Sequence, residues 1–246
     1  MVRTLLVRGM IAGVVAAVLA YAFAWLFGEP ALDGGIAYED ALAAAAGETG
    51  GEELVSRGVQ STVGLLVALL IYGIVVGGVL ALVYAGVQGR LLRLAPRATA
   101  GVLALIGYVV VVLVPFLKYP SNPPASSADD TIGLRSGTFV FMLLLSVVAA
   151  VVAVAVGRRL VERFGTWNGV LAGAAVYVVL VGVVAALLPV VSETPADFPA
   201  VVLYNFRVAT LGIHAVLWTA VGLLFGLFVT RGLRSSERPS AGAGVG

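Results

Sequence analysis

The sequence predicts an all-α membrane protein, a polytopic transmembrane bundle of six helices arranged as three helical hairpins. Of its 246 residues, 61% are apolar and only 11% are charged, less than half of the roughly 25% charged residues in a soluble domain. Six apolar stretches each approach or exceed the about 20 residues that a helix needs to cross a bilayer. Basic residues gather in alternate connectors, as in multi-pass membrane proteins.

The composition also excludes several classes of protein. A chain this apolar makes neither a cytosolic enzyme nor a disordered protein, and we expect no nucleic-acid partner. Its apolar stretches lack the alternation of an outer-membrane barrel. Cysteine is absent and His214 is the single histidine, which excludes thiolate and histidine-rich metal sites. No phosphate-binding GxxxxGK[ST] motif occurs, so the chain does not look like an ATPase by itself. We also expect neither an enzyme nor a permanently bound cofactor.

The predicted spans follow one another with short connectors. They cover residues 5–27, 62–87, 100–117, 136–156, 169–191 and 208–230. Each is expected to be helical, because lipid offers no hydrogen-bond partner to an unpaired backbone. Residues 1–234 are expected to form one transmembrane domain, followed by a polar, disordered tail at 235–246. The first span begins like a signal peptide, but its apolar run is longer than usual and favours a retained helix.

Charge placement predicts the topology. Eleven of the 15 basic residues lie at the N-terminal end of the first span, after the last span, or between the second and third and the fourth and fifth spans. The positive-inside rule places these segments, and therefore both termini, in the cytoplasm, and we expect the protein in the plasma (inner) membrane. The remaining connectors hold 11 of the 13 acidic residues and are expected to face outwards.

Glycine pairs four residues apart predict where helices approach closely. They are Gly9/Gly13, Gly73/Gly77, Gly169/Gly173 and Gly222/Gly226. We interpret them as packing faces within the bundle. Each outer connector also ends in an arginine, which is consistent either with three copies of one hairpin or with the general preference of helix ends for arginine; these residues are Arg57, Arg135 and Arg207.

The outer connectors hold the candidate metal ligands. Carboxylate oxygens suit hard or borderline divalent cations, and Pro120, Pro123 and Pro124 make the second connector rigid and non-helical. An entry site at the outer mouth is therefore hypothesised from Glu29 in the first connector, Tyr119, Asn122 and Asp130 in the second, and Glu193 and Asp197 in the third. The alternative for the second connector is a stiff turn in which Asp130 caps the next helix.

The last span has one polar face. Arg207, Thr210, His214 and Trp218 follow at helical spacing, which places His214 about 10 Å below Arg207. An ionisable side chain at that depth is a functional candidate, and imidazole is a good ligand for cobalt, nickel or zinc. The alternative is a neutral histidine satisfied by one interhelical hydrogen bond. Arg135, Arg207 and Trp218 are expected to support the site.

Three segments resemble the CbtA family of predicted cobalt transporter subunits. They are Phe27-Gly28-Glu29-Pro30, the run from Leu117 to Pro124 with Asp130-Thr131-Ile132, and Leu188-Pro189 with the run from Glu193 to Ala200, Phe206-Arg207 and Trp218. The resemblance covers about residues 3–232. It implies cobalt uptake for cobalamin synthesis beside a small, single-helix, histidine-bearing CbtB-type subunit.

We therefore expect an integral membrane subunit that passes cobalt(II) inward, embedded in the lipid bilayer with its CbtB-type partner or as a homo-oligomer. One alternative keeps transport but changes the cargo to nickel or a corrinoid precursor. Another is a scaffold that transports nothing and holds a small partner through glycine-rich faces. A membrane enzyme fits least well, because acids and arginines alone name no reaction.

Overall fold

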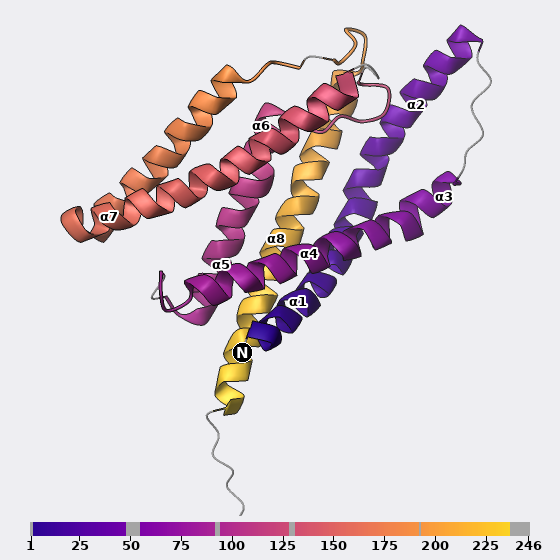
Figure 1. Ribbon diagram of the computed structural model, residues 1–246. Helices are drawn as coiled ribbons and strands as arrows, with labels where there is room; N and C mark the ends of the chain where they lie inside the picture. Colours follow the sequence, from indigo (N-terminus) through magenta and orange to yellow (C-terminus); the bar gives the residue numbers. More distant parts are fainter. Residues whose placement is uncertain (1, 48–54, 92–93, 128–130, 192, 237–246) are drawn as a thin grey trace, which may run out of the picture. The chain divides into compact units, whose positions relative to one another are not determined.

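The computed structural model describes residues 2–47, 55–91, 94–127, 131–191 and 193–236, and most of them are helical (Figure 1). Three of the elements are π-helical turns, which we label η. In chain order the elements are α1 (Val2–Phe23), η1 (Ala24–Gly28), α2 (Glu29–Ala46), α3 (Arg57–Val59), η2 (Gln60–Gly64), α4 (Leu65–Val87), α5 (Pro96–Gly107), η3 (Tyr108–Leu113), α6 (Val114–Lys118), α7 (Ile132–Leu187) and α8 (Ala200–Ser236).

Five continuous helical segments are long and apolar enough to cross a membrane, where the sequence predicts six. They are Val2–Ala46, Arg57–Val87, Pro96–Lys118, Ile132–Leu187 and Ala200–Gly232. Four of them contain one predicted span each. The fourth, α7, contains the predicted span 136–156 and most of 169–191. The difference arises because the two predicted spans are joined directly at Gly165, with helix on both sides of it, and together form the single element α7.

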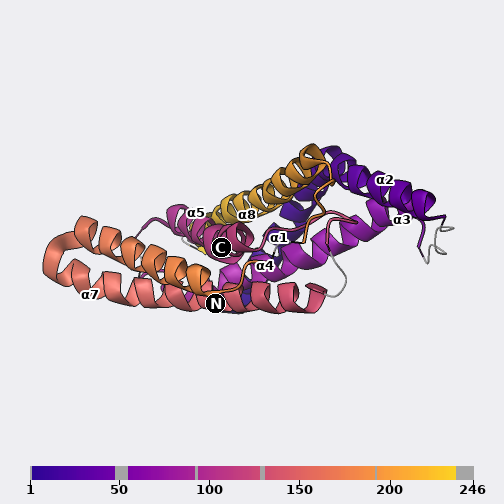
Figure 2. The same cartoon turned by 90° about the horizontal axis from the view of Figure 1, so that it is seen from above.

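The 56 residues of α7 nevertheless form two arms. Gly165 has φ 82° and ψ 165°, a conformation that is essentially restricted to glycine. Figures 1 and 2 both show the chain turning back within α7, so that its two arms lie side by side. A Cβ on Gly157 would lie 3.1 Å from the carbonyl oxygen of Gly169, which shows how closely the two arms approach.

Two π turns precede prolines within long helical segments. An α-helical proline loses a hydrogen bond and its ring clashes with the carbonyl four residues earlier. Here η1 widens the helix before Pro30, and η3 widens it before Pro115. The chain therefore stays helical through Gly28-Glu29-Pro30 and on to Ala46. The prediction of a connector beginning after residue 27 is wrong for residues 28–46.

The chain divides into two compact units. One comprises Met1–Glu29, Glu52–Gly107 and Gly212–Gly246, and the other comprises Pro30–Gly51 and Tyr108–Leu211. A single domain over residues 1–234 stays a prediction. Helix α8 extends to Ser236, two residues into the predicted tail, and residues 237–246 lie outside the described part of the chain.

Within the first unit, the predicted glycine pairs join α1 to α4. Gly9 faces Gly77, and Gly13 faces Gly73. A Cβ on any of the four would overlap a backbone carbonyl oxygen of the facing helix. The backbones therefore touch along this glycine seam, which replaces side-chain packing by backbone-to-backbone van der Waals contact.

The other glycine pairs are also packing faces. Gly222 and Gly226 of α8 lie against α5. A Cβ on Gly222 would lie 2.5 Å from the Ala104 Cβ, and a Cβ on Gly226 would lie 3.1 Å from the Arg97 Cα. In the second unit, Gly169 and Gly173 lie against the first arm of α7, and a Cβ on Gly173 would lie 3.0 Å from the Ala153 carbonyl oxygen. The sequence interpretation of these pairs as bundle-packing faces is confirmed.

We predict that Gly77→Val destabilises the protein by about 3 kcal/mol or more, because overpacking here pushes against backbone and not against a flexible side chain. Gly86→Val in the same helix is the matched control, since a Cβ on Gly86 meets nothing within 4 Å. Thermal unfolding of the detergent-solubilised protein measures both. Equal losses for the two variants would contradict the seam.

Candidate functional site

Polar groups from four segments of the second unit form one connected group, which we call the loop network. Its members are Ser121, Asn122, Ser127, Arg135, Glu193 and Arg207. Arg207 of α8 donates to the Asn122 side-chain oxygen at 2.8 Å and, through Nε, to the Ser121 carbonyl at 3.4 Å. The predicted ligand Asn122 is therefore fixed by an arginine.

Ser127 links the two arginines of the loop network. Its hydroxyl oxygen accepts from Arg135 Nη1 at 2.5 Å and from the Asn122 amide at 3.2 Å. Arg135 also donates to Glu193 Oε2 at 3.4 Å, forming an ion pair. Arg135 and Arg207 each contact one predicted ligand, Glu193 and Asn122 respectively, and their supporting role stays a prediction.

Glu193 is the acidic member of the loop network, and its side chain is deeply buried. Its side chain is 2% exposed, whereas that of Arg135 is 27% exposed. Oε2 faces the guanidinium, but Oε1 is buried and has no hydrogen-bond partner among the described residues. A buried anionic oxygen without a partner is costly. A cation placed at Oε1 would supply the missing partner.

The proline-rich segment that carries Asn122 is held by its own side chains. The Ser126 hydroxyl donates to the Pro123 carbonyl at 2.6 Å, closing a turn, and Ala125 has φ 57°. Tyr119 is 4% exposed, and its hydroxyl donates to the Pro189 carbonyl at 2.8 Å. The predicted non-helical conformation of this segment is confirmed, and Tyr119 joins it to the segment that carries Glu193.

The other acids of the predicted entry site have different surroundings. Glu29, at the start of α2, forms an ion pair with Arg57 of α3, and its side chain is 13% exposed. Asp197 is exposed beside Phe198, whose buried ring packs edge-on against Tyr38 at 4.8 Å. Asp130 lies outside the described residues. Of the six predicted ligands, Asn122 and Glu193 share the loop network, and Tyr119 is tied to the segment beside it.

His214 lies in an aromatic group of the first unit. Its ring meets Tyr72 of α4 edge-on, with centroids 5.2 Å apart. Trp218 donates its indole N–H to the Tyr72 hydroxyl at 3.3 Å, and a Cβ on Gly107 would overlap the Trp218 ring. His214 Nδ1 is buried without a hydrogen-bond partner among the described residues, so the interhelical hydrogen bond that the sequence alternative requires is not made by this nitrogen.

Sequence reasoning missed several polar residues that the fold brings together. Ser127 and Tyr72 stand in stretches with no distinguishing motif. Ser146 is fully buried and donates to the Val110 carbonyl of η3 at 2.7 Å, while the Tyr177 hydroxyl lies 2.8 Å from the Ser146 oxygen. Since Ser146 has one proton, Tyr177 is the donor in that pair. The sequence signal for such a donor is Pro115. Proline has no backbone N–H, so a carbonyl earlier in the helix is left without its usual hydrogen-bond partner.

No group of three or more histidine, cysteine, aspartate or glutamate side chains within metal-binding reach occurs among the described residues. The loop network instead offers one carboxylate with amide, hydroxyl and carbonyl oxygens. Such oxygen ligands favour hard and borderline cations and hold them less tightly than a cage of several anionic ligands.

The sequence model of the CbtA family, described as a probable cobalt transporter subunit, matches residues 2–230. No curated protein and no protein of solved structure shows significant similarity to the chain.

We predict that Arg135→Gln destabilises the protein by about 3 kcal/mol, because removing one partner leaves the other charge buried. The double variant Arg135→Gln/Glu193→Gln should recover most of that loss. Arg57→Gln is the comparison, with a smaller expected loss since its partner Glu29 is 13% exposed and Glu193 is 2% exposed. Thermal unfolding in detergent measures all three, and no recovery in the double variant would contradict the buried charge.

Proposed function

The chain belongs to the CbtA family of probable cobalt transporter subunits, and we propose that it forms the membrane-embedded path by which cobalt(II) enters the cell for cobalamin synthesis. The five helices capable of crossing a membrane agree with that role. The observation that carries the proposal is the buried oxygen Oε1 of Glu193, which lacks a partner among the described residues.

Glu193 is the proposed entry ligand. A cation at Oε1 is attracted by the carboxylate charge and meets neutral oxygens of the loop network, which suit cobalt(II). Before the ion arrives, Arg135 balances the carboxylate charge. On binding, the ion displaces the Arg135 guanidinium from Glu193 toward the Ser127 hydroxyl, to which Arg135 already donates a hydrogen bond. An arginine that competes with the ion keeps affinity low, and conduction requires an ion to leave as readily as it enters.

The route inward needs further ligands. His214 is proposed as one of them, because its buried Nδ1 has no described hydrogen-bond partner and neutral imidazole binds cobalt(II). A small CbtB-type subunit would supply more imidazoles. A membrane potential of 100 mV contributes about 4.6 kcal/mol for a divalent ion, twice the value for a single charge, which is sufficient drive for inward movement without an attached ATPase.

We propose six crossings with both termini in the cytoplasm. A straight 56-residue helix would be about 84 Å long, yet Arg135 near its start is 3.4 Å from Glu193 just beyond its end. Each arm of α7 exceeds the about 20 residues that span a bilayer. Two crossings by α7 place the segments holding Asn122 and Glu193 on the same side, which agrees with the loop network.

Cobalt uptake tests the entry ligand. We expect Glu193→Gln to reduce radioactive cobalt uptake by metal-starved cells at least about tenfold, equivalent to about 1.4 kcal/mol, since the amide keeps the shape but removes the charge. Asp40→Asn is the control, because Asp40 is an exposed acid of α2 outside the predicted site. Uptake is measured with and without the CbtB-type subunit and normalised to the amount of protein in the membrane.

Equal uptake by the Glu193→Gln variant and the wild-type protein would overturn the entry site. In that case His214→Gln shows whether the imidazole is the essential ligand. Uptake that needs the small subunit but is insensitive to both substitutions would favour the scaffold. Nickel uptake in preference to cobalt would change the cargo and keep the site.

Topology is testable with single cysteines, because the natural chain has none. Gly133→Cys, Thr166→Cys and Ala196→Cys are exposed positions at the start, turn and far end of the α7 hairpin. We expect a membrane-impermeant thiol reagent to label positions 133 and 196 in intact cells, and position 166 only after the membrane is opened. Labelling of 133 and 196 from opposite sides would mean that α7 crosses once.

A further inference from the structure

A cavity between α1 and α8 in the first unit has a composition that fits an anionic ligand. It has a volume of about 350 Å³ and is lined by Arg8, Ile11, Phe228, Arg231 and Gly232. Two of these five residues carry a guanidinium and none is acidic. We propose that this cavity binds the phosphate headgroup of an anionic membrane lipid, independently of the transported cargo.

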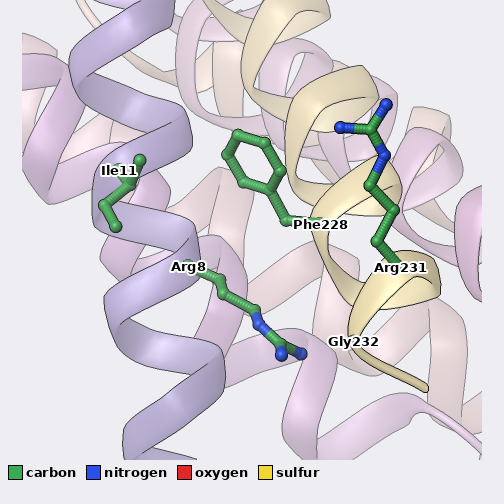
Figure 3. Close-up of a pocket in the computed structure, with 5 residues that line it drawn as sticks. All are labelled: Arg8, Ile11, Phe228, Arg231 and Gly232. Atoms are coloured by element: carbon green, nitrogen blue, oxygen red, sulfur yellow. The ribbon is translucent and has the colours of Figure 1, made fainter. Parts of the chain in front are cut away.

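The helix periodicity builds the cavity from two faces. Arg8 and Ile11 are three residues apart on α1, and Phe228, Arg231 and Gly232 are three and four residues apart on α8, spacings that share a helix face. Figure 3 shows Phe228 between the two helices and Arg8 reaching from α1 to Gly232 on α8. A Cβ on Gly232 would overlap the Arg8 guanidinium, so the glycine makes room for this arginine.

The arginines stand where a lipid phosphate would lie. Apolar residues follow Arg8 along α1, and the apolar run of α8 ends at Thr230, just before Arg231. Arg231 therefore stands at the end of the apolar run of α8, and Arg8 stands in the first turn of the predicted span 5–27, from which its long side chain can extend to the polar boundary. That boundary coincides with the headgroup layer when the helices cross a bilayer.

The chemistry of the lining distinguishes a lipid from a smaller anion. Guanidinium groups bind phosphate through paired hydrogen bonds, and basic pockets between transmembrane helices bind anionic headgroups. Ile11 is 50% exposed and Phe228 is half-buried, so both present apolar surface next to the charges. An acyl chain covers that surface, whereas free phosphate leaves it in contact with water.

Lipid binding to the purified, delipidated full chain in detergent tests the proposal. Native mass spectrometry measures binding of phosphatidylglycerol, with phosphatidylcholine and inorganic phosphate as separate arms. We expect about fivefold weaker phosphatidylglycerol binding for Arg8→Gln or Arg231→Gln, and about 25-fold for both together. Gly232→Ala keeps both charges but displaces Arg8, so it should also weaken binding.

The matched control is Arg90→Gln/Arg158→Gln, which removes two exposed charges outside the cavity. Its binding should stay within about twofold of wild type, because attraction to anionic lipid falls off within a Debye length. Thermal unfolding without lipid checks that the cavity variants remain folded, and phosphatidylglycerol should raise the midpoint of the wild-type protein alone.

Three outcomes would overturn the proposal. Equal losses in the cavity and control variants would show general charge attraction. Equal binding of phosphatidylcholine would remove the preference for an anionic lipid. Competition by inorganic phosphate at millimolar concentration, with no requirement for acyl chains, would make free phosphate the ligand.

Discussion

The reversal of α7 at Gly165 is the constraint on which the loop network depends. The left-handed backbone at this glycine returns the second arm along the first, and the close contacts at Gly157, Gly169 and Gly173 hold the arms together. Arg135 and Glu193 thereby become neighbours although they are 58 residues apart. Without the reversal, the carboxylate and its counter-charge would stand at opposite ends of a long helix.

The prolines inside the long helices are accommodated by local changes in the helical hydrogen bonding. Every buried N–H and C=O must find a partner when water is absent. The π turns before Pro30 and Pro115 accommodate the rings without ending the helix, and Ser146 donates to a carbonyl that the second of these turns leaves accessible. Local irregularity therefore serves to maintain hydrogen bonding along long helices.

The loop network combines one buried carboxylate with two arginines, which a simple cation site would not contain. Arg207 orients the Asn122 amide, and Arg135 neutralises Glu193. Counter-charges of this kind lower the cost of burying an acid while leaving one oxygen available. The arrangement suits an ion that binds briefly and moves on, in contrast to a metal that stabilises a fold.

Hydropathy, small-residue spacing and motif runs are local properties, so the sequence alone predicted apolar helices able to cross a membrane, the glycine packing faces and the CbtA family, but not that two predicted spans join in α7. It also singled out Glu193, Asn122, Arg135 and Arg207 as residues of one site. Which of these side chains contact one another became visible only in the fold. There Glu29 pairs with Arg57, Ser127 belongs to the loop network, and Tyr72 accepts a hydrogen bond from Trp218 beside His214. These contacts depend on where the helices change direction. A reversal such as the one at Gly165, or a π turn, moves the residues that follow it and so changes which side chains come into contact far along the chain.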